Sequence, residues 1–251
     1  MSASIDHVTL RCSDLDASLR LFTQVFELLE FRDRRHDGGG FHEWHDLSIA
    51  SADDANPATR RLHVGLAASS CAQVDDWWRE LTAAGYRDDG APGPRPEYSP
   101  EYYGAFIRDN DDNSIEAVHH ARSDPSSGVI DHLWIRVRDL AATRRFYAAV
   151  AQALGLRVPE RSDRFHVVTD TGTFTLLEAD EATRGLHLAL GVGDAETVQA
   201  FHAAGLGAGG VDNGAPGERP VYHAGYYAAY LRDPDANNIE AVWHNRADGR
   251  A

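Results

Sequence analysis

Six ionisable side chains in this chain have the types and positions of metal ligands. Each lies in a short strand-like run, on the face opposite the leucines and valines that would pack against helices. A carboxylate buried in such a strand needs a compensating charge. Two imidazoles and one carboxylate form the triad that Fe(II) favours and that Mn, Ni or Zn also accept. We therefore predict one triad in each half of the chain: His7, His63 and Glu116, then His132, His187 and Glu240.

The strands that carry these residues occur twice along the chain. Residues 102–118 and 226–242 both show a strand pattern, a turn and a second strand, at an offset of 124 positions. From residue 90 to residue 120, 19 of 31 residues are identical to those 124 positions later. This self-similarity predicts a tandem duplication, with a first domain at 1–120, a linker at 121–128 and a second domain at 129–247.

Apolar periodicity predicts the same order of elements in both repeats, a strand, a helix and three strands, twice over. In the first repeat we expect strands at 5–10, 31–36, 41–50 and 62–66, and a closing hairpin that ends at 120. One helix is expected to begin near Leu15, and a second is expected to begin near Ala72 and to end before Gly85. The segment 90–100 is rich in glycine and proline and is predicted to be a loop. If the helices cover the outside of the sheet, the ionisable side chains converge inside its curve.

Composition excludes several classes of function. The net charge of −15 opposes binding to nucleic acids and to anionic membranes. Every basic residue is arginine, and without lysine the chain has neither a Schiff-base amine nor a P-loop. No apolar run approaches the length of a membrane span. Cys12 and Cys71 are expected to be free thiols, and we predict a cytoplasmic protein.

Three motifs occur at corresponding places in the repeats. Ile-Asp-His begins at residues 5 and 130, Leu-His begins at residues 62 and 186, and Asp-Pro-Asp-x-Asn-x-Ile-Glu occupies 233–240. Together they resemble the vicinal oxygen chelate superfamily, which includes glyoxalase I, extradiol dioxygenases and bleomycin-resistance proteins. The resemblance implies an α+β fold of tandem domains, each of two βαβββ modules forming an eight-stranded, incompletely closed mixed β-barrel with helices outside. It also implies that the six ionisable residues are the superfamily's metal positions.

The same resemblance implies further site residues. Extradiol dioxygenases carry a tyrosine ten residues before the glutamate and a histidine a few residues earlier, which Tyr230 and His223 match; the first repeat has Phe106 at the tyrosine position. Glyoxalase-like members add a fourth ligand, usually glutamate, for which Glu178 is the candidate in the second repeat. The second repeat is therefore expected to be catalytic, with Tyr230 and His223 as proton-transfer or hydrogen-bonding groups.

Two functions fit these residues. The first is a metalloenzyme that acts on a small vicinal-oxygen substrate in a dioxygenase-like or lyase/isomerase-like reaction, with Fe²⁺ as the favoured cofactor and Mn²⁺, Ni²⁺ or Zn²⁺ as alternatives. The alternative is a metal-free, drug-sequestering binding protein in which histidine and glutamate form a hydrogen-bonded cluster. The expected partner is a small molecule, without nucleic acid or membrane, and the domains pair within the chain or in a homodimer.

Overall fold

The computed structural model describes residues 3–31, 40–121, 123, 126 and 128–245, and the backbone alone of residues 35–36. Part of the predicted linker and residues 32–34 of the predicted strand at 31–36 therefore lie outside the described residues. The chain divides into two compact units, unit 1 (Met1–Val8 and Ile135–Ala251) and unit 2 (Thr9–Trp134). Strands β1 (Ser4–Cys12) and β9 (Ile130–Val137) are each shared between the units.

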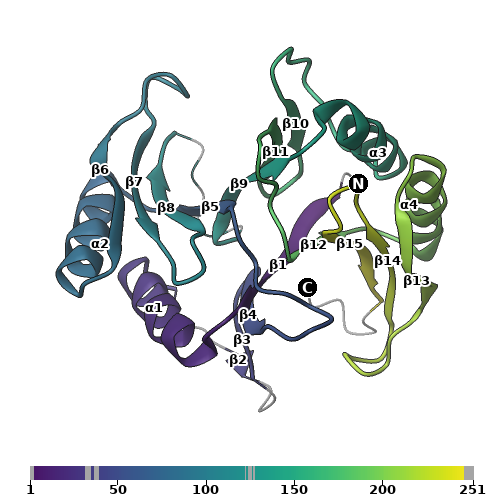
Figure 1. Ribbon diagram of the computed structural model, residues 1–251, viewed down its shortest axis with the longest axis horizontal. Coiled ribbons are helices and arrows are strands. Elements are labelled where there is room, and N and C mark those ends of the chain that lie inside the picture. Colours follow the sequence, from purple (N-terminus) through teal and green to yellow (C-terminus); the bar gives the residue numbers. More distant parts are fainter. Residues whose placement is uncertain are drawn as a thin grey trace. The chain divides into compact units, whose positions relative to one another are not determined.

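Each unit combines two helices with hairpins of short strands (Figure 1). Unit 2 contains, in chain order, α1 (Leu15–Leu28), β2 (Arg35–His36), β3 (Phe41–Trp44), β4 (Leu47–Ser51), β5 (Leu62–Ala67), α2 (Cys71–Ala83), β6 (Arg87–Pro94), β7 (Tyr103–Arg108) and β8 (Ser114–His119). Unit 1 contains α3 (Leu140–Ala153), β10 (Phe165–Val168), β11 (Thr173–Glu178), β12 (Leu186–Gly191), α4 (Ala195–Gly207), β13 (Val211–Glu218), β14 (Tyr226–Arg232) and β15 (Asn238–His244).

The strand order of the two units corresponds, as the duplication predicts, except that β2 has no counterpart among the described strands of unit 1. In unit 2 the hydrogen-bonded orders are β9-β5-β8-β7-β6 and β1-β4-β3-β2; in unit 1 they are β1-β12-β15-β14-β13 and β9-β11-β10. The β5–β8 and β12–β15 pairs are parallel, whereas the hairpins are antiparallel, so the sheets are mixed. Among the described residues no sheet closes into a barrel. The predicted α+β fold of tandem βαβββ modules with an incompletely closed barrel is confirmed.

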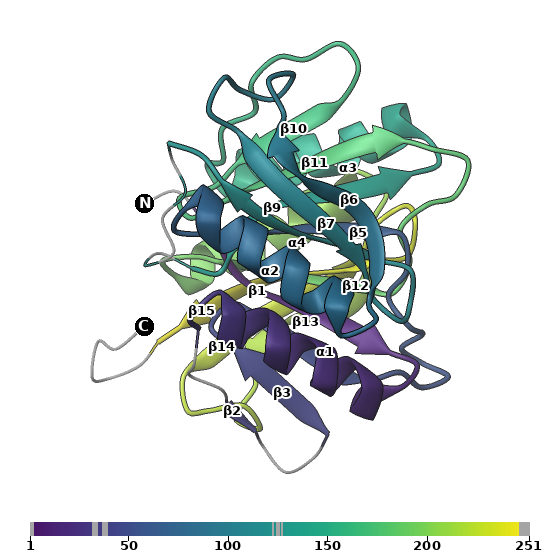
Figure 2. The same ribbon diagram turned by 90° about the vertical axis from the view of Figure 1, so that its left-hand side faces the viewer.

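The helices lie on the outer faces of the sheets, as predicted (Figures 1 and 2). Each begins at a side chain that accepts a hydrogen bond from the first turn: Asp14, Ser70, Asp139 and Asp194. Their apolar faces are buried against the strands, with Phe22, Phe26 and Trp77 fully covered in unit 2 and Phe146 and Phe201 in unit 1. No helix of the described residues is long and apolar enough to cross a membrane.

The prediction of a loop at 90–100 is wrong in its first part, because β6 continues to Pro94. The strand is irregular: its pairing with β7 shifts register on both sides of Gly90, which has a φ of +156°. A Cβ at Gly90 would lie 2.7 Å from the ring of Phe106. Glycine is required here by backbone conformation and by the close approach of a ring, and in a sequence this requirement looks like a loop signal.

The turn between β14 and β15 is held by one buried carboxylate. Asp233 is 3% exposed and accepts hydrogen bonds from the backbone N–H groups of Asp235 and Asn237 and from the hydroxyl of Tyr147. Because its loss leaves these donors unsatisfied, we expect Asp233→Ala to lower the free energy of unfolding by ~3 kcal/mol. The partly exposed neighbour Asp235, replaced by alanine, should cost under ~1 kcal/mol. Urea unfolding measures both, and equal losses would contradict this account of the turn.

Candidate metal centres

All six predicted ligands lie in two groups of three, one in each unit. Within each group the ligand atoms lie within 4.8 Å of one another. Site A, in unit 1, consists of His7, His187 and Glu240, and site B, in unit 2, consists of His63, Glu116 and His132.

The prediction of one triad per repeat is wrong in its grouping, because the first histidine of each repeat is exchanged. Strand β1 carries His7 and pairs with β12, the strand of His187, whereas β9 carries His132 and pairs with β5, the strand of His63. The two repeats offer equivalent strand edges, so periodicity alone does not determine which edge β1 joins. Each triad is nevertheless completed within one chain.

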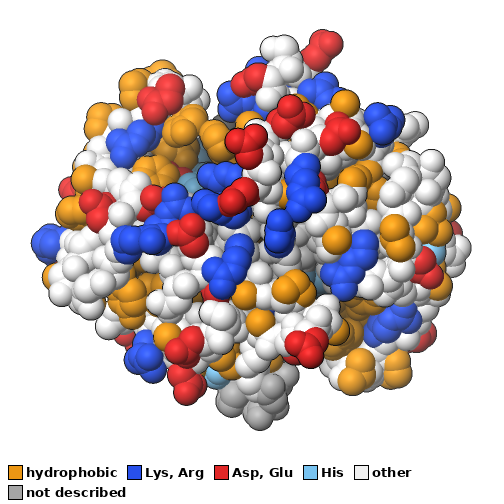
Figure 3. Space-filling view, in the orientation of Figure 1, with side chains coloured by type: hydrophobic (Ala, Val, Ile, Leu, Met, Phe, Trp, Pro, Cys, Tyr) orange, Lys and Arg blue, Asp and Glu red, His pale blue; other side chains and the backbone are white. Residues whose placement is uncertain are grey.

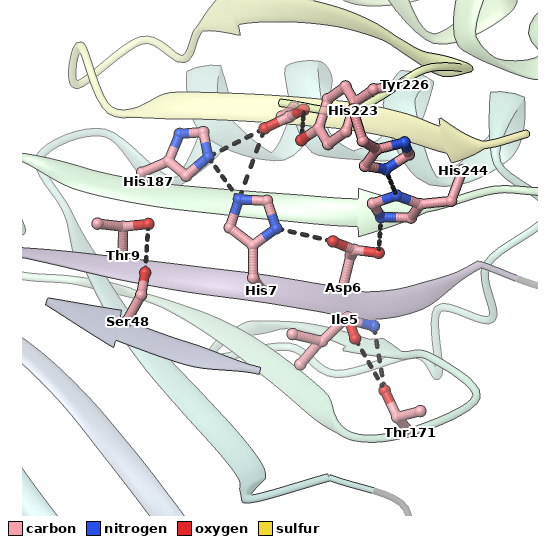
Figure 4. Close-up of polar contacts among 11 residues, drawn as sticks. Ile5, Asp6, His7, Thr9, Ser48, Thr171, His187, His223, Tyr226 and His244 are labelled. Atoms are coloured by element: carbon pink, nitrogen blue, oxygen red, sulfur yellow. Dashed lines mark hydrogen bonds and ion pairs between the residues drawn. The ribbon is translucent and has the colours of Figure 1, made fainter. Parts of the chain in front are cut away.

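Site A gathers two imidazole nitrogens around one buried carboxylate oxygen (Figure 4). Nε2 of His187 lies 3.0 Å and Nε2 of His7 lies 3.7 Å from Oε2 of Glu240, and the two nitrogens are 3.1 Å apart. The other carboxylate oxygen, Oε1, accepts a hydrogen bond of 2.7 Å from the hydroxyl of Tyr226. Glu240 is 1% exposed. One oxygen of Glu240 is thus held by the protein, and the other faces both histidines.

Site B repeats this arrangement with a tighter triangle. Nε2 of His63 and Nε2 of His132 lie 2.9 and 3.3 Å from Oε2 of Glu116 and 3.2 Å from each other. Tyr102 donates to Oε1 of Glu116 at 2.9 Å. A Cβ at Gly65 would collide with the ring of His132, so glycine lets this ring approach the carboxylate. The corresponding residue of β12 is Ala189, in keeping with the longer distance from His7 to Glu240.

The carboxylates at both sites are ionised despite their burial. Burial alone would raise the pKa of Glu116, but hydrogen bonds and positive charge from His132 and His63 lower it to about 2. The pKa of Glu240 is also lowered, because its interactions with His187 and His7 outweigh desolvation. Burial would lower the pKa of His132, but Asp131 and Glu116 raise it to about 10. Both glutamates are therefore held as carboxylates, the form that binds a cation.

A carboxylate behind the first histidine orients each triad. At site A, Nδ1 of His7 donates to Asp6 at 2.7 Å; the other oxygen of Asp6 lies 2.9 Å from Nε2 of His244, whose Nδ1 lies 2.8 Å from His223 (Figure 4). The amide of Asn238 lies 2.5 Å from Nδ1 of His187. These contacts direct Nε2 of both histidines toward Glu240, as second-layer partners of metal-binding histidines commonly do.

Site B has the same support for its first histidine. Nδ1 of His132 donates to Asp131 at 2.8 Å, and Asp131 also lies 2.9 Å from Nε2 of His120. The ring of His120 stacks on that of Tyr102, with centroids 5.7 Å apart and planes at 18°. Sequence reasoning assigned no role to either aspartate or to His120 and His244. A signal was present, since the Asp-His pair and the later histidine both recur in the two repeats.

The two predicted catalytic residues occupy different places. The ring of Tyr230 lies 6.4 Å from that of His187, and the guanidinium of Arg219 lies 5.5 Å above it. Burial and the charge of Glu240 raise the pKa of Tyr230. His223, in contrast, contacts His244, Tyr226 and the carbonyl of Ala224, so that His244 and Asp6 separate it from His7. The resemblance implies that His223 lies beside the open positions, whereas its contacts belong to the network that supports His7.

The proposed fourth ligand does not join site A. Glu178 is exposed, and its Oε2 accepts a hydrogen bond from the backbone N–H of Leu140 at the start of α3. Within the described residues, neither triad has a fourth His, Cys, Asp or Glu close enough to extend it. The expectation of a glutamate ligand at this position is therefore wrong, because that side chain stabilises a helix end instead.

Both triads fit a divalent transition metal. For metal–ligand distances of about 2.1 Å, neighbouring donors of an octahedral or tetrahedral ion are separated by about 3.0 to 3.4 Å. The donor separations at site B, 2.9, 3.2 and 3.3 Å, and two of those at site A, 3.0 and 3.1 Å, lie in or close to this range. The third separation at site A, from His7 to Glu240, is longer, at 3.7 Å. The donor set, two imidazoles and a carboxylate, is the one that Fe(II) shares with other first-row metals.

Comparison with known proteins agrees with the fold and the duplication. The family model for the Glyoxalase/Bleomycin resistance protein/Dioxygenase superfamily matches residues 4–117 and again residues 129–241. The chain belongs to this superfamily. Among solved structures, glyoxalase I from Zea mays is similar in fold, with a TM-score of 0.67 and 18% identity over 97% of this chain and 93% of that chain. A putative dioxygenase from Bacillus subtilis has a TM-score of 0.62 and 12% identity over 98% and 86% of the two chains. No curated protein matches the sequence.

Proposed function

We propose that this member of the superfamily is a divalent-metal-dependent enzyme that acts at site A on a small substrate with two neighbouring oxygen atoms. Fe²⁺ is the favoured ion, held by His7, His187 and Glu240. When bound, the ion would supply a Lewis acid and a template for the substrate oxygens. The observation that carries the proposal is the convergence of two oriented Nε2 atoms on one oxygen of a buried glutamate whose other oxygen is occupied by Tyr226.

Between the two reaction types open to the superfamily, the side chains favour a dioxygenase-type reaction. Within the part of the chain that the structure describes, the triad has three protein ligands and lacks the fourth carboxylate expected of glyoxalase-like members. Three ligands leave positions for two substrate oxygens and a further reactant. Tyr230 stands where extradiol dioxygenases carry a tyrosine, and its raised pKa keeps the phenol protonated, so it can donate a hydrogen bond or a proton to a substrate oxygen.

The test combines metal analysis with a screen for activity. Protein purified without oxygen should contain close to two equivalents of iron or another divalent metal per chain, and oxygen uptake should follow the addition of one or more catechols. Turnover of a glutathione hemithioacetal without oxygen uptake would favour the isomerase-type reaction instead. Protein that binds drug-like ligands and never binds metal would establish the metal-free alternative.

Asp6 should control the metal affinity of site A alone. Because Asp6 holds the Nδ1–H of His7, Asp6→Asn should weaken metal binding at site A by roughly 10- to 100-fold. Asp131→Asn is the matched control and should weaken site B to a similar extent. Calorimetric titration with Mn²⁺ should show two binding phases, and each variant should weaken a different one of them. A change in the same phase for both variants would show that the aspartates do not serve separate centres.

The evolutionary units are proposed to be residues 1–120 and 129–247 with a linker at 121–128, supported by the two family matches. A cytoplasmic location is proposed on the two free cysteines, Cys12 and Cys71. The partner is proposed to be a small molecule, and the net charge of −15 argues against nucleic acid.

A further inference from the structure

The two triads are nearly alike, but their surroundings differ. At site B the ring of His63 is flanked by Trp134 and Phe106, with centroids 6.1 and 5.8 Å away. Tyr98 packs edge-on against Trp134, with ring centroids 5.5 Å apart, and at a tilt against Tyr102, with ring centroids 5.0 Å apart. Trp134 and Phe106 are half-buried and Tyr98 is 47% exposed. We call Trp134, Phe106 and Tyr98 the aromatic wall of site B.

The wall lies at the surface, where a ligand can reach it. Hydrophobic side chains gather over β6 and β7, and a histidine side chain is visible beneath them (Figure 3). Arg95 stacks on the outer part of the wall, with its guanidinium 5.4 Å from the ring of Phe106. The wall therefore continues from the metal ligands to solvent on one side of the triad.

Site A differs from this wall at two of its three positions. The strand residue two places after His7 is Thr9, whereas the residue two places after His132 is Trp134. Tyr230 is the counterpart of Phe106, and its ring carries a hydroxyl group beside His187. The hydroxyl of Thr9 is hydrogen-bonded to Ser48 at 2.8 Å. At these two positions the residue of site A is thus smaller or more polar than its counterpart in the wall of site B, whereas the third position carries a tyrosine, Tyr222, as in site B.

We propose that site B selects flat, extended aromatic molecules with two neighbouring hydroxyl groups, and that Trp134 is the main determinant of this selectivity. The proposal rests on the proposed function for the part played by the two oxygens. A ligand whose two oxygens bind the metal ion beside His63 would have its ring system next to the indole of Trp134 and the ring of Phe106. Edge and face contacts with these rings are favourable. A single-ring catechol contacts less of the wall and therefore gains less binding free energy from it.

The experiment is a calorimetric titration of Fe(II)-loaded protein under nitrogen, which prevents turnover. The probes are naphthalene-2,3-diol, catechol and 2-naphthol, which has the extended ring but only one oxygen. We expect one tight and one weaker equivalent for naphthalene-2,3-diol, and Trp134→Thr should weaken the tight equivalent by roughly tenfold. Catechol should be affected less than threefold. The control is Trp78→Thr, which removes a half-buried tryptophan on α2 and should change neither affinity.

The outcomes separate this inference from the proposed function. If 2-naphthol binds as tightly as the diol and depends equally on Trp134, the wall is supported and the role of the metal is wrong. If the diol binds more tightly than 2-naphthol but Trp134→Thr has no effect, the metal is supported and the wall is refuted. The absence of any tight equivalent also refutes the wall. Phe106→Leu is the second variant in case Trp134→Thr does not fold, and it should weaken the same equivalent.

Discussion

Replacing His7 and His187 together by alanine should remove one of two metal equivalents per chain, whereas replacing His7 and His63 together should remove both. The first pair lies in site A, so site B keeps its three ligands; the second pair takes one ligand from each site. Loss of one of three protein ligands leaves two donors, too few to hold a divalent ion in competition with a chelator. Elemental analysis after dialysis against a weak chelator measures the stoichiometry.

This pair of variants tests the exchanged grouping directly. Had the triads formed within the repeats, the two results would be reversed, because His7 and His63 would then share one centre. His202→Ala is the control: it removes a half-buried histidine that bonds to Asp212 at the surface and should leave two equivalents. Circular dichroism and the urea midpoint establish that each variant is folded, since a buried glutamate without its histidines is costly.

Replacing Tyr230 by phenylalanine should lower kcat by roughly 10²- to 10³-fold while the metal content stays at two equivalents. The hydroxyl is buried, and its raised pKa keeps it protonated, so its role is that of a hydrogen-bond or proton donor to a substrate oxygen. The ring itself remains in Tyr230→Phe, which keeps the contact with Arg219. Oxygen uptake with the catechol identified in the screen measures kcat and KM separately.

Tyr227→Phe is the matched control for this loss. Tyr227 is the half-buried tyrosine of the same strand whose hydroxyl bonds to Gln199 on α4, and its replacement should change kcat less than twofold. The reverse substitution at site B, Phe106→Tyr, should leave metal content unchanged and tests whether a hydroxyl confers turnover there. If the Tyr230→Phe enzyme keeps its kcat, or if it loses metal, the proposed role of Tyr230 as a donor to the substrate is wrong.

Periodicity and repetition were sufficient to predict much of the fold. The identity of residues 90–120 with those 124 positions later predicts two copies of one domain, and alternation within each strand indicates which side chains share a face. The six ligands could be identified for this reason: each is a histidine or a carboxylate that alternates with apolar residues in its strand. The glycines of β6 were misinterpreted as loop residues because a strand that bulges around the ring of Phe106 needs the same residue.

The candidate ligands can be recognised from residue types and spacing, but which of them meet is known only from the folded chain. His7 and His132 begin equivalent strands, and the edges of β12 and β5 are equivalent acceptors for them, so no local pattern distinguishes the two pairings. Only the path of the whole chain places β1 beside β12 and β9 beside β5. The supporting contacts of Asp6, Asp131, His120 and His244 depend on the same path, because they join residues as far apart as Asp6 and His244.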